Sequence, residues 1–377
     1  MVKTYCFKLY NSKRNKHLHR LINLSAEIYN HCIALHKRYY RVYGVHLNKS
    51  KLQSHITKLK KLERHNHWNN LGSQAIQEIT DRIESAYTLF FRNLKRKIRC
   101  APPSFKKRVK YKSFTLKQAG YKLSDDNAVL IGKRKYKFFK SREIDGKIKT
   151  VTVKRDNLNN LYIYFVCDIS DTNKPVRTRT GKSVGFDFGL TTYLKASDGN
   201  DIESPLFFKD SQNIIKKFNR ALSRKQRGSN NRRKAKRALT KQHIRIANQR
   251  KDFQFKLAKE LCETYDLICL EDLNIKAMQM MWGKKISDLS HSSFVNILKQ
   301  QAVRHDVIVS EIPRFYPSSK TCSNCGVAVD ELPLKVRSWT CTACNAAHDR
   351  DFNAATNILR VGASTLGGDT VNPASVG

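Results

Sequence analysis

Two closely spaced cysteine pairs constrain the fold of this 377-residue chain more than any other feature. Cys322 and Cys325 form one C-x2-C pair, and Cys341 and Cys344 form another after fifteen intervening residues. This spacing is typical of a tetrahedral zinc site with four thiolate ligands, and two disulfides are the alternative. In the cytosol, where we expect the protein, reducing conditions disfavour disulfides. Because thiolates fill every coordination position, we predict one structural Zn²⁺ ion that folds a small loop with little core of its own.

The second cysteine pair leads directly into a short acidic segment, HDRD at 348–351, and an alanine-rich helical pattern follows. If a helix begins near Asp349, that residue is placed to cap the helix and accept a backbone N–H group. Asp351 then shares one helical face with small and apolar residues that can pack closely on a sheet: Ala354, Ala355 and Ile358. We therefore expect Asp351, and not Asp349, to point toward the strand ends of the core.

Two further acidic residues lie in strand-like apolar runs, in a chain that is poor in acid. Asp187 lies in VGFDFGLTTYL, and Glu271 ends DLICLE. Taken singly, each has an ordinary explanation as a cap or an ion-pair partner. Carboxylates that converge from such positions can instead bind two Mg²⁺ ions for phosphodiester hydrolysis. Mg²⁺ needs only a few carboxylates together with water and phosphate, so neither histidine nor cysteine is required.

The balance of charge points to a polyanionic partner. The chain has 72 Lys and Arg against 31 Asp and Glu, a formal net charge of +41. A compact body with this charge repels itself unless a polyanion neutralises it, and nucleic acid is the natural one. A membrane is the rival, but the longest apolar run, Leu161–Cys167, has only the length of a strand. The first residues lack the apolar core of a signal peptide, so we expect a cytoplasmic protein that is nucleoid-associated when bound to DNA.

Two basic tracts contain no acid and are the predicted phosphate contacts. Residues 92–112 hold ten Lys and Arg, and residues 211–251 hold fifteen. A short basic run is usually a solvated face, but tracts of this length favour phosphate contact. Three aromatic residues near the first tract either stack on bases or face inward from a strand: Phe105, Tyr111 and Phe114. The basic residues that we select as contacts are Lys106, Lys107, Arg232, Arg233 and Lys234.

Hydrophobic periodicity predicts a strand-rich part with a helical insert, followed by a mixed α/β part. Ten cysteines occur in all, and the six outside the two pairs are expected to be small buried hydrophobes. The predicted elements are a strand in VKTYCFKLY, helices over 14–44, 49–64 and 72–98, strands within 113–170, a linker at 175–181, a basic helical stretch over 211–263 and a helix over 292–305.

Four stretches resemble the motifs of a known family: GFDFGLTTYLKASDG, CLEDLNI, PSSKTCSNCG and RSWTCTACNAAHDRDFNAATNIL. They are similar to motifs of TnpB, a family of transposon-encoded RNA-guided nucleases. The resemblance places the chain beside the ancestral family of the single-effector type V CRISPR nucleases. The resemblance is highly specific over residues 181–360. Upstream it is weaker, and PPSFKKR and the helical AYTLFFRNLK match the family only in character.

The resemblance implies a multidomain α/β protein with a β-barrel. One part would be a RuvC-like nuclease domain of the RNase H type, split by a zinc ribbon that binds target nucleic acid. The other would be an N-terminal wedge-type β-barrel interrupted by a helical recognition lobe. The implied bounds are 1–11 and 99–176 for the barrel, 12–98 for the helical lobe, 177–317 and 347–362 for the nuclease domain, 318–346 for the zinc ribbon and 363–377 for a disordered tail.

The resemblance also implies a site and partners. The family's acidic triad falls on Asp187, Glu271 and Asp351, which would hold two catalytic Mg²⁺ ions. Its zinc ligands fall on the four paired cysteines, and Arg337 matches a basic position near the scissile phosphate. The implied partners are a guide RNA from the transposon end, with one protein monomer per RNA, and double-stranded target DNA beside a short motif. Gln74 and Gln77 could read that motif, although each alone is better explained as an ordinary exposed helix residue.

The predicted function is therefore that of a Mg²⁺-dependent, RNA-guided DNA endonuclease of a transposon. A catalytically inactive RNA-guided regulator is the first alternative, but such a protein would be expected to have lost an acid of the triad. A DNA transposase is less favoured, because its acids usually end in Glu, whereas the order here is Asp, Glu, Asp. A simple RNA-binding protein would account for the charge but not for the acids.

Overall fold

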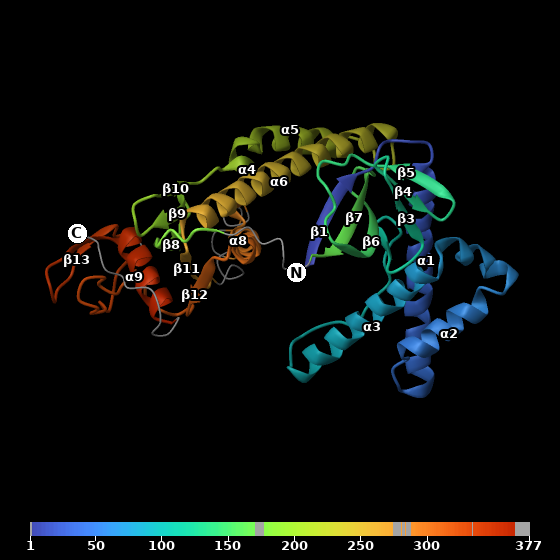
Figure 1. Ribbon diagram of the computed structural model, residues 1–377, viewed down its shortest axis with the longest axis horizontal. Helices are drawn as coiled ribbons and strands as arrows, with labels where there is room; N and C mark the ends of the chain where they lie inside the picture. The colour runs from blue at the N-terminus through green and yellow to red at the C-terminus, as the bar shows by residue number, and fades with distance from the viewer. Residues whose placement is uncertain are drawn as a thin grey trace. The chain divides into compact units, whose positions relative to one another are not determined.

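The computed structural model describes residues 2–169, 177–273, 280, 283, 288–333 and 335–365. The chain forms two compact units, Met1–Asn173 and Lys174–Gly377 (Figure 1). Each unit buries hydrophobic clusters of its own, and each combines helices with sheets. The predicted mixed α/β content is confirmed.

An antiparallel four-stranded sheet is the base of the first unit, in the order β1-β7-β6-β2. Its strands alternate between buried and more exposed residues, because successive side chains of a strand point to opposite faces. A second antiparallel sheet, β3-β4-β5, is linked to the first by a β-bridge between Leu9 and Phe138, and closure into a barrel remains a prediction. The strands are β1 (Val2–Lys8), β2 (Ser113–Leu116), β3 (Tyr121–Ser124), β4 (Ala128–Ile131), β5 (Arg134–Lys137), β6 (Lys147–Arg155) and β7 (Leu161–Asp168).

Three α-helices lie between β1 and β2 along the chain, as the periodicity predicts: α1 (Asn15–Tyr43), α2 (Lys49–Leu59) and α3 (Ser73–Lys95). α1 ends at Gly44, whose φ of 65° suits a left-handed cap. α2 is shorter than predicted, and a 3-10 helix at Glu63–Leu71 takes up the rest. This tighter segment places Trp68 in the core, where its indole N–H donates to Glu27 at 2.9 Å.

A five-stranded sheet organises the second unit, in the order β10-β9-β8-β11-β12. The central β11 runs parallel to both of its neighbours, whereas β9 is antiparallel to β8. Both faces of β11 are buried, which explains why DLICLE reads as a continuous apolar run. The strands are β8 (Ser183–Phe188), β9 (Thr192–Ala196), β10 (Ile202–Glu203), β11 (Leu267–Glu271) and β12 (Ile308–Ile312).

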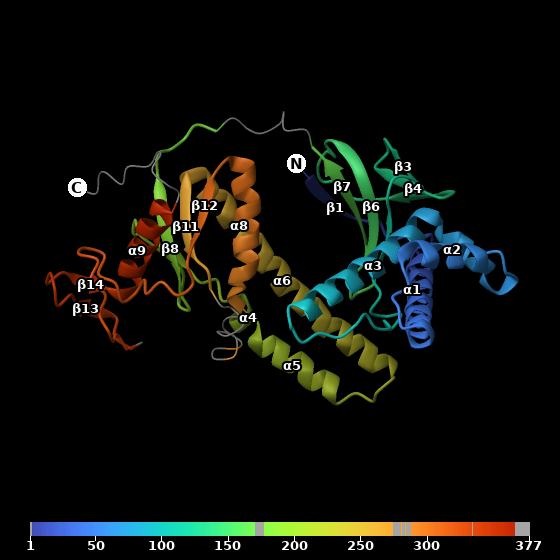
Figure 2. The ribbon, with the colours of Figure 1, turned by 90° about the horizontal axis from the view of Figure 1, so that it is seen from below.

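Helices cover the two faces of this sheet, as Figure 2 shows. α6 (Asn230–Thr264) and α8 (His291–His305) share a hydrophobic core with one face. α9 (Arg350–Ser364) packs on the other face through Ile358. The α/β order predicted for this part of the chain is therefore a sheet between two helical layers.

α9 lies close to the sheet because small residues face each other at the contact. A Cβ added at Gly185 of β8 would overlap the backbone of Ala355, and a Cβ added at Gly362 would overlap Cys269. Ala354 and Ala355 are almost completely buried. The prediction that small residues let this helix approach the core is confirmed.

The basic stretch predicted over 211–263 is not one helix. It begins with α5 (Gln212–Ser223), which the short α4 (Phe207–Asp210) precedes. The chain then turns through Gly228, at a φ of +88°, before α6 begins. Ser229 caps α6 by accepting the backbone N–H of Arg232. α5 has already ended at Ser223, so the glycine belongs to the turn and the serine starts the second helix, a signal that the charge pattern obscured.

The remaining described elements are two short strands, β13 (Ser338–Thr340) and β14 (Ala347–Asp349), which pair as an antiparallel hairpin before α9. Residues 366–377 of the predicted tail and residues 170–176, which include the start of the predicted linker, lie outside the described part of the chain. No helix within that part has both the length and the apolar character needed to cross a bilayer.

Candidate carboxylate site and four-cysteine cluster

Asp187 and Glu271 lie side by side at the carboxyl edge of the second unit's sheet. β8 and β11 are parallel, and Phe186 pairs with Leu270, so the acid that follows each of them comes at the same level. Both acids are half-buried. Asp351, in the first turn of α9, is close enough for its charge to act on Asp187. The structure thus brings the three predicted acids to one edge of the sheet.

Burial and mutual repulsion disfavour the charged forms of two of these acids. Burial is the main cause that raises the pKa of Asp187 to about 6, and the charge of Asp351 adds to it. Burial also raises the pKa of Glu271 to about 7, with smaller contributions from Asp187 and Asp272. Negative charge that is crowded and poorly compensated in this way fits a bound divalent cation.

The three carboxylates do not form a closed group of ligands. Among the described residues, the four cysteines are the one group of three or more potential metal ligands that the structure brings together, with ligand atoms that all lie within 4.8 Å of one another. Mg²⁺ binds through one or two carboxylates together with water and phosphate, so it does not need a closed protein shell.

Arg337 pairs with the third acid. Its Nη1 lies 3.3 and 3.2 Å from Oδ1 and Oδ2 of Asp351. The backbone N–H of Arg350 donates to the carbonyl oxygen of Arg337 at 2.7 Å, which ties the segment before β13 to the start of α9. The side chain of Asp351 remains 44% exposed, so a ligand can still reach it.

Two neighbouring acids have partners of their own. Asp349 Oδ1 accepts the N–H of Phe352 at 2.8 Å, so the predicted helix cap is confirmed. Asp272 follows Glu271 directly, and its Oδ2 lies 2.6 Å from Nη2 of Arg314. The sequence alone could not relate Arg314 to Asp272, because no local spacing connects residues 42 positions apart. Glu271 is therefore the acid at the end of β11 that is left for a ligand.

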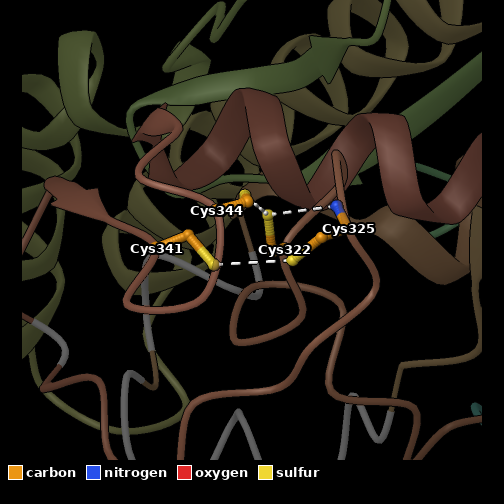
Figure 3. Close-up of side chains that lie close together, drawn as sticks. All are labelled: Cys322, Cys325, Cys341 and Cys344. Carbon is orange, nitrogen blue, oxygen red and sulfur yellow. Dashed lines mark hydrogen bonds between the residues drawn. The ribbon is translucent and has the colours of Figure 1, made fainter.

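The four cysteine sulfur atoms converge on one point (Figure 3). Sγ of Cys322 lies 3.6 Å from Sγ of Cys344, and Sγ of Cys325 lies 3.6 Å from Sγ of Cys341. Four thiolates around Zn²⁺ at a Zn–S distance of about 2.3 Å would be about 3.8 Å apart in a tetrahedron. All four are free of disulfides, so the residues present fit the predicted metal.

Each cysteine pair sits in a tight turn that holds its sulfur atoms in place. The N–H of Gly326 donates to Cys322 O at 2.9 Å, and the N–H of Asn345 donates to Cys341 O at 2.9 Å. Both donors have positive φ, 81° and 56°, which glycine and asparagine adopt most readily. The pKa of Cys344 is lowered to about 6, chiefly because the N–H of Ala346 donates to its sulfur, whereas the pKa of Cys325 is raised to about 12. Among these thiols, Cys344 therefore becomes a thiolate more readily than Cys325.

The predicted contacts of the first unit divide into exposed and structural residues. Lys106 and Lys107 are exposed. Gln77 is also exposed, whereas Oε1 of Gln74 accepts the backbone N–H of Gln118 at 3.4 Å. Of the three aromatic residues, Tyr111 and Phe114 are buried in the core and Phe105 is 53% exposed. The inward-facing alternative therefore holds for two of them. Phe105 is exposed, and its ring carries the ammonium of Lys37 at 4.6 Å from the ring centroid.

Arg232 differs from its neighbours on α6. Its Nη1 donates to Leu222 O at 2.8 Å and to Lys225 O at 2.9 Å, so its guanidinium holds the turn between α5 and α6. Arg233 and Lys234 are exposed. The prediction that all three face phosphate is thus weakened at Arg232, whose structural role comes from a turn that the charge pattern did not reveal.

Two family models match this chain. A model described as "Probable transposase" matches residues 164–281, and one described as "Cas12f1-like, TNB domain" matches residues 291–358. Together they include the three acids and the four cysteines.

Curated relatives and solved structures agree with these matches. A "Putative RNA-guided DNA endonuclease" of Streptomyces pristinaespiralis is 36% identical over 59% of this chain and 56% of its own length. "TnpB-like protein L79" of Acanthamoeba polyphaga mimivirus is 32% identical over 57% of this chain and 43% of its own length. The chain thus spans about half the length of these two relatives. "Putative RNA-guided DNA endonuclease InsQ" of Escherichia coli K12 is 28% identical over 78% of this chain and 75% of its own length.

Two solved structures share the fold. The protein in "Cryo-EM structure of the Cas12f1-sgRNA-target DNA complex" aligns with a TM-score of 0.57 at 13% identity, over 95% of this chain and 98% of that one. The protein in "Structure of the mini-RNA-guided endonuclease CRISPR-Cas_phi3" aligns with a TM-score of 0.54 at 10% identity, over 99% and 93%. At these identities the likeness establishes the mixed α/β fold.

Proposed function

We propose that this chain, which belongs to the TnpB family, is an RNA-guided DNA endonuclease of a transposon. It would bind a guide RNA, recognise double-stranded DNA beside a short motif and cut it by metal-dependent hydrolysis. The observation that carries the proposal is the convergence of Asp187, Glu271 and Asp351 at one edge of the second unit's sheet.

In this proposal the second unit is a RuvC-like nuclease domain, with residues 318–346 as its inserted zinc ribbon. The sheet order supports the assignment: β8, β11 and β12 are parallel, and β9 is antiparallel beside β8. In the first unit, the two linked sheets would be the wedge-type barrel, and α1 to α3 would be the recognition insert.

Asp187, Glu271 and Asp351 would bind and orient two Mg²⁺ ions. When bound, these ions supply the positive charge that activates water and stabilises the leaving oxygen of a phosphodiester. Ionised Asp187 and Glu271 repel each other, and a bound cation would offset that repulsion. Arg337 would move its guanidinium from Asp351 to the scissile phosphate, since both are anionic oxygen pairs that suit its fork.

The four cysteines would hold one Zn²⁺ ion with a structural role. The cluster has no open position for water, so it has no place in the hydrolysis itself. Its effect on cutting would be through the position of the 318–346 loop and of α9, which follows it.

The proposed partners are a guide RNA from the transposon end and double-stranded target DNA, with one protein monomer per RNA. The net charge of +41 and the exposed basic faces of α5 and α6 support phosphate binding. Base pairing with the guide would read the target, and the protein would read backbone shape and the adjacent motif.

An inactive RNA-guided regulator is the second candidate, and the presence of all three acids at one edge disfavours it. A strand-joining transposase is disfavoured by the Asp, Glu, Asp order, although one matching family model is described as "Probable transposase". No feature of the site's geometry favours either candidate over the endonuclease.

The experiment is to purify the protein from cells that contain its own locus, sequence the RNA that copurifies, and test cutting of a DNA that matches it. We expect one RNA species with a defined strand and 3′ end, and Mg²⁺-dependent cleavage that Asp187→Ala abolishes. A random mixture of cellular RNA, or a defined RNA without any cutting by the wild-type protein, would contradict the endonuclease assignment.

A further inference from the structure

The first cysteine pair is fastened to α9 by a buried asparagine. Asn353 is 1% exposed, and its Oδ1 accepts the N–H of Ser323, which lies between Cys322 and Cys325. Its Nδ2 donates to Thr321 O at 2.8 Å. The amide of Asn353 therefore both accepts from and donates to the backbone of the same turn. Asn353 itself lies two residues after Asp351.

Asn357 extends this attachment by one helical turn. It is completely buried, and its Nδ2 donates to Thr321 O at 2.6 Å and to Ser318 O at 2.9 Å. Oδ1 of the same side chain is buried and has no hydrogen-bond partner among the described residues. Loss of the Nδ2 bonds would leave further buried groups unpaired, which is costly, so these bonds hold the loop and the helix in one arrangement.

His348 makes a second connection, to a zinc ligand itself. Its Nε2 lies 3.0 Å from Sγ of Cys322. Its ring also packs against Trp339, with 4.8 Å between ring centroids, and the two residues are paired across the β13–β14 hairpin. A zinc-bound thiolate has no proton to donate, so with zinc bound His348 would supply an N–H···S hydrogen bond to Cys322. It lies outside a four-sulfur group that is already complete.

Asp351 lies between these two connections. His348 is three residues before it and Asn353 is two residues after it, and both bind the turn that contains Cys322. We propose that His348 and Asn353 form a clamp that transmits the zinc-bound geometry of Cys322 to Asp351. Both are positioning residues, and the effect on the catalytic metal rests on the proposed nuclease function.

Two consequences follow from the clamp. Donors to metal ligands typically change metal affinity by about 10–100-fold, so loss of the His348 N–H should speed zinc release. If the clamp holds Asp351 in place, a change that loosens the clamp should also weaken cation binding at the carboxylates. If His348 only stabilised the hairpin, its loss would change neither the rate of zinc release nor the affinity of the carboxylates for a cation.

The test uses the full chain with its bound guide RNA and four variants: His348→Ala, His348→Gln, Asn353→Ala and the control Asn296→Ala, on the exposed side of α8. Zinc release to a chromophoric chelator is the first measurement. We expect release about 10-fold faster in His348→Ala. His348→Gln should be close to wild type, because its amide also donates an N–H, and Asn296→Ala should match wild type. Equal rates in wild type and His348→Ala would overturn the proposal.

The second measurement is Mn²⁺ binding to the same preparations by titration calorimetry. We expect several-fold weaker binding in His348→Ala and Asn353→Ala than in wild type and Asn296→Ala. Faster zinc release with unchanged Mn²⁺ affinity would overturn the transmission to Asp351. A wild-type protein that binds no Mn²⁺ would overturn the proposed function and the transmission with it, while zinc release would still decide the contact between His348 and Cys322.

Substitution of Co²⁺ for Zn²⁺ tests whether His348 is itself a ligand. The expected absorption spectrum is that of four sulfur ligands, unchanged in His348→Ala apart from its stability. A spectrum of three sulfur atoms and one nitrogen in the wild-type protein would overturn the proposed role of His348 as a donor to Cys322.

Discussion

The cysteine cluster and the carboxylate edge are the two metal-binding regions of the second unit, and they are built in different ways. The cysteines come from residues 322–344, and two tight turns of backbone place their sulfur atoms. The carboxylates come from β8, β11 and α9, which meet only because the sheet and its covering helix have packed. One region is local and the other depends on the whole fold.

The cysteine cluster and the carboxylate edge also differ in how their ligand groups are arranged and charged. The four sulfur atoms lie within 4.8 Å of one another and form a complete set of ligands. The carboxylates do not form such a set: two of them have raised pKa values, and the third is paired with Arg337. A complete set suits a structural ion, whereas an open and strained set suits an ion that must also bind substrate.

The largest expected effect is at Asp351. Asp351→Ala should lower cleavage of guide-matched DNA by about 100-fold or more, the scale on which removal of one group from a preorganised site acts. Guide RNA and target binding should persist, because the helix cap at Asp349 is intact. Cleavage and binding are measured on the same preparation. Full activity in this variant would mean that the open carboxylate arrangement is not the reacting site.

The next effect is at the cysteine cluster. Cys325→Ser should remove zinc, increase proteolysis within residues 318–346 and reduce cleavage, because the loop lacks a core of its own. Elemental analysis should find one zinc per chain in the wild type. Cys100→Ser, at a half-buried cysteine of the first unit, is the matched control. Wild-type protein without zinc but with normal cleavage would remove the structural role.

The raised pKa values predict that the metal-free carboxylate edge opposes folding at neutral pH. Asp187 and Glu271 have folded pKa values of about 6 and 7, against unfolded values near 4. The folded state therefore binds their protons more tightly, and the free energy of unfolding decreases as the pH rises from about 4 to 7. With a chelator at pH 8, Asp187→Asn should stabilise the protein, on the order of 1–3 kcal/mol.

Denaturant unfolding at pH 5 and pH 8 measures this effect, with the exposed Asp210→Asn as control. Added Mn²⁺ should stabilise the wild type at pH 8 and have little effect on Asp187→Asn, since a ligand stabilises only a state that binds it. Destabilisation by Asp187→Asn at pH 8 without metal would show that the acids are not crowded.

A smaller effect is expected on the basic face of α6. Arg233→Ala combined with Lys234→Ala should reduce the slope of log K against log salt for RNA binding by about 1.5, at roughly 0.7–0.9 per phosphate contact. Arg232→Ala should instead lower thermal stability and leave the slope unchanged, because its guanidinium holds the α5–α6 turn. An unchanged slope in the double variant would mean that this face is only solvated.

The smallest effect is at Asp349. Asp349→Ala removes one N-cap hydrogen bond and should cost about 1 kcal/mol of stability while most cleavage is retained. Thermal unfolding and the cleavage assay used for Asp351→Ala give the comparison. A folded Asp349→Ala protein that binds its target but does not cut would show that the reacting acid has been assigned to the wrong residue.

Much of the fold was predictable where one element decides its own structure. The helical period located α1 and α3, and the cap at Asp349 and the small face of α9 followed from spacing within a single helix. The errors came where composition hid a turn, as at Gly228 and Ser229 in the basic stretch. The burial of the aromatic residues near Lys106 could not be predicted for a different reason. Alternation along a strand does not say which of its two faces is covered.

The sequence by itself determined the four-cysteine cluster and the orientation of Asp351 relative to Asp349, because both depend on spacings of a few residues along one segment. Only the tertiary structure paired Asp272 with Arg314, assigned Arg232 to a turn, and connected His348 and Asn353 to the turn of Cys322. These contacts depend on which strand, loop or helix packs against which. That packing joins residues far apart in the chain, and the hydrophobic pattern of a single element does not specify its partners.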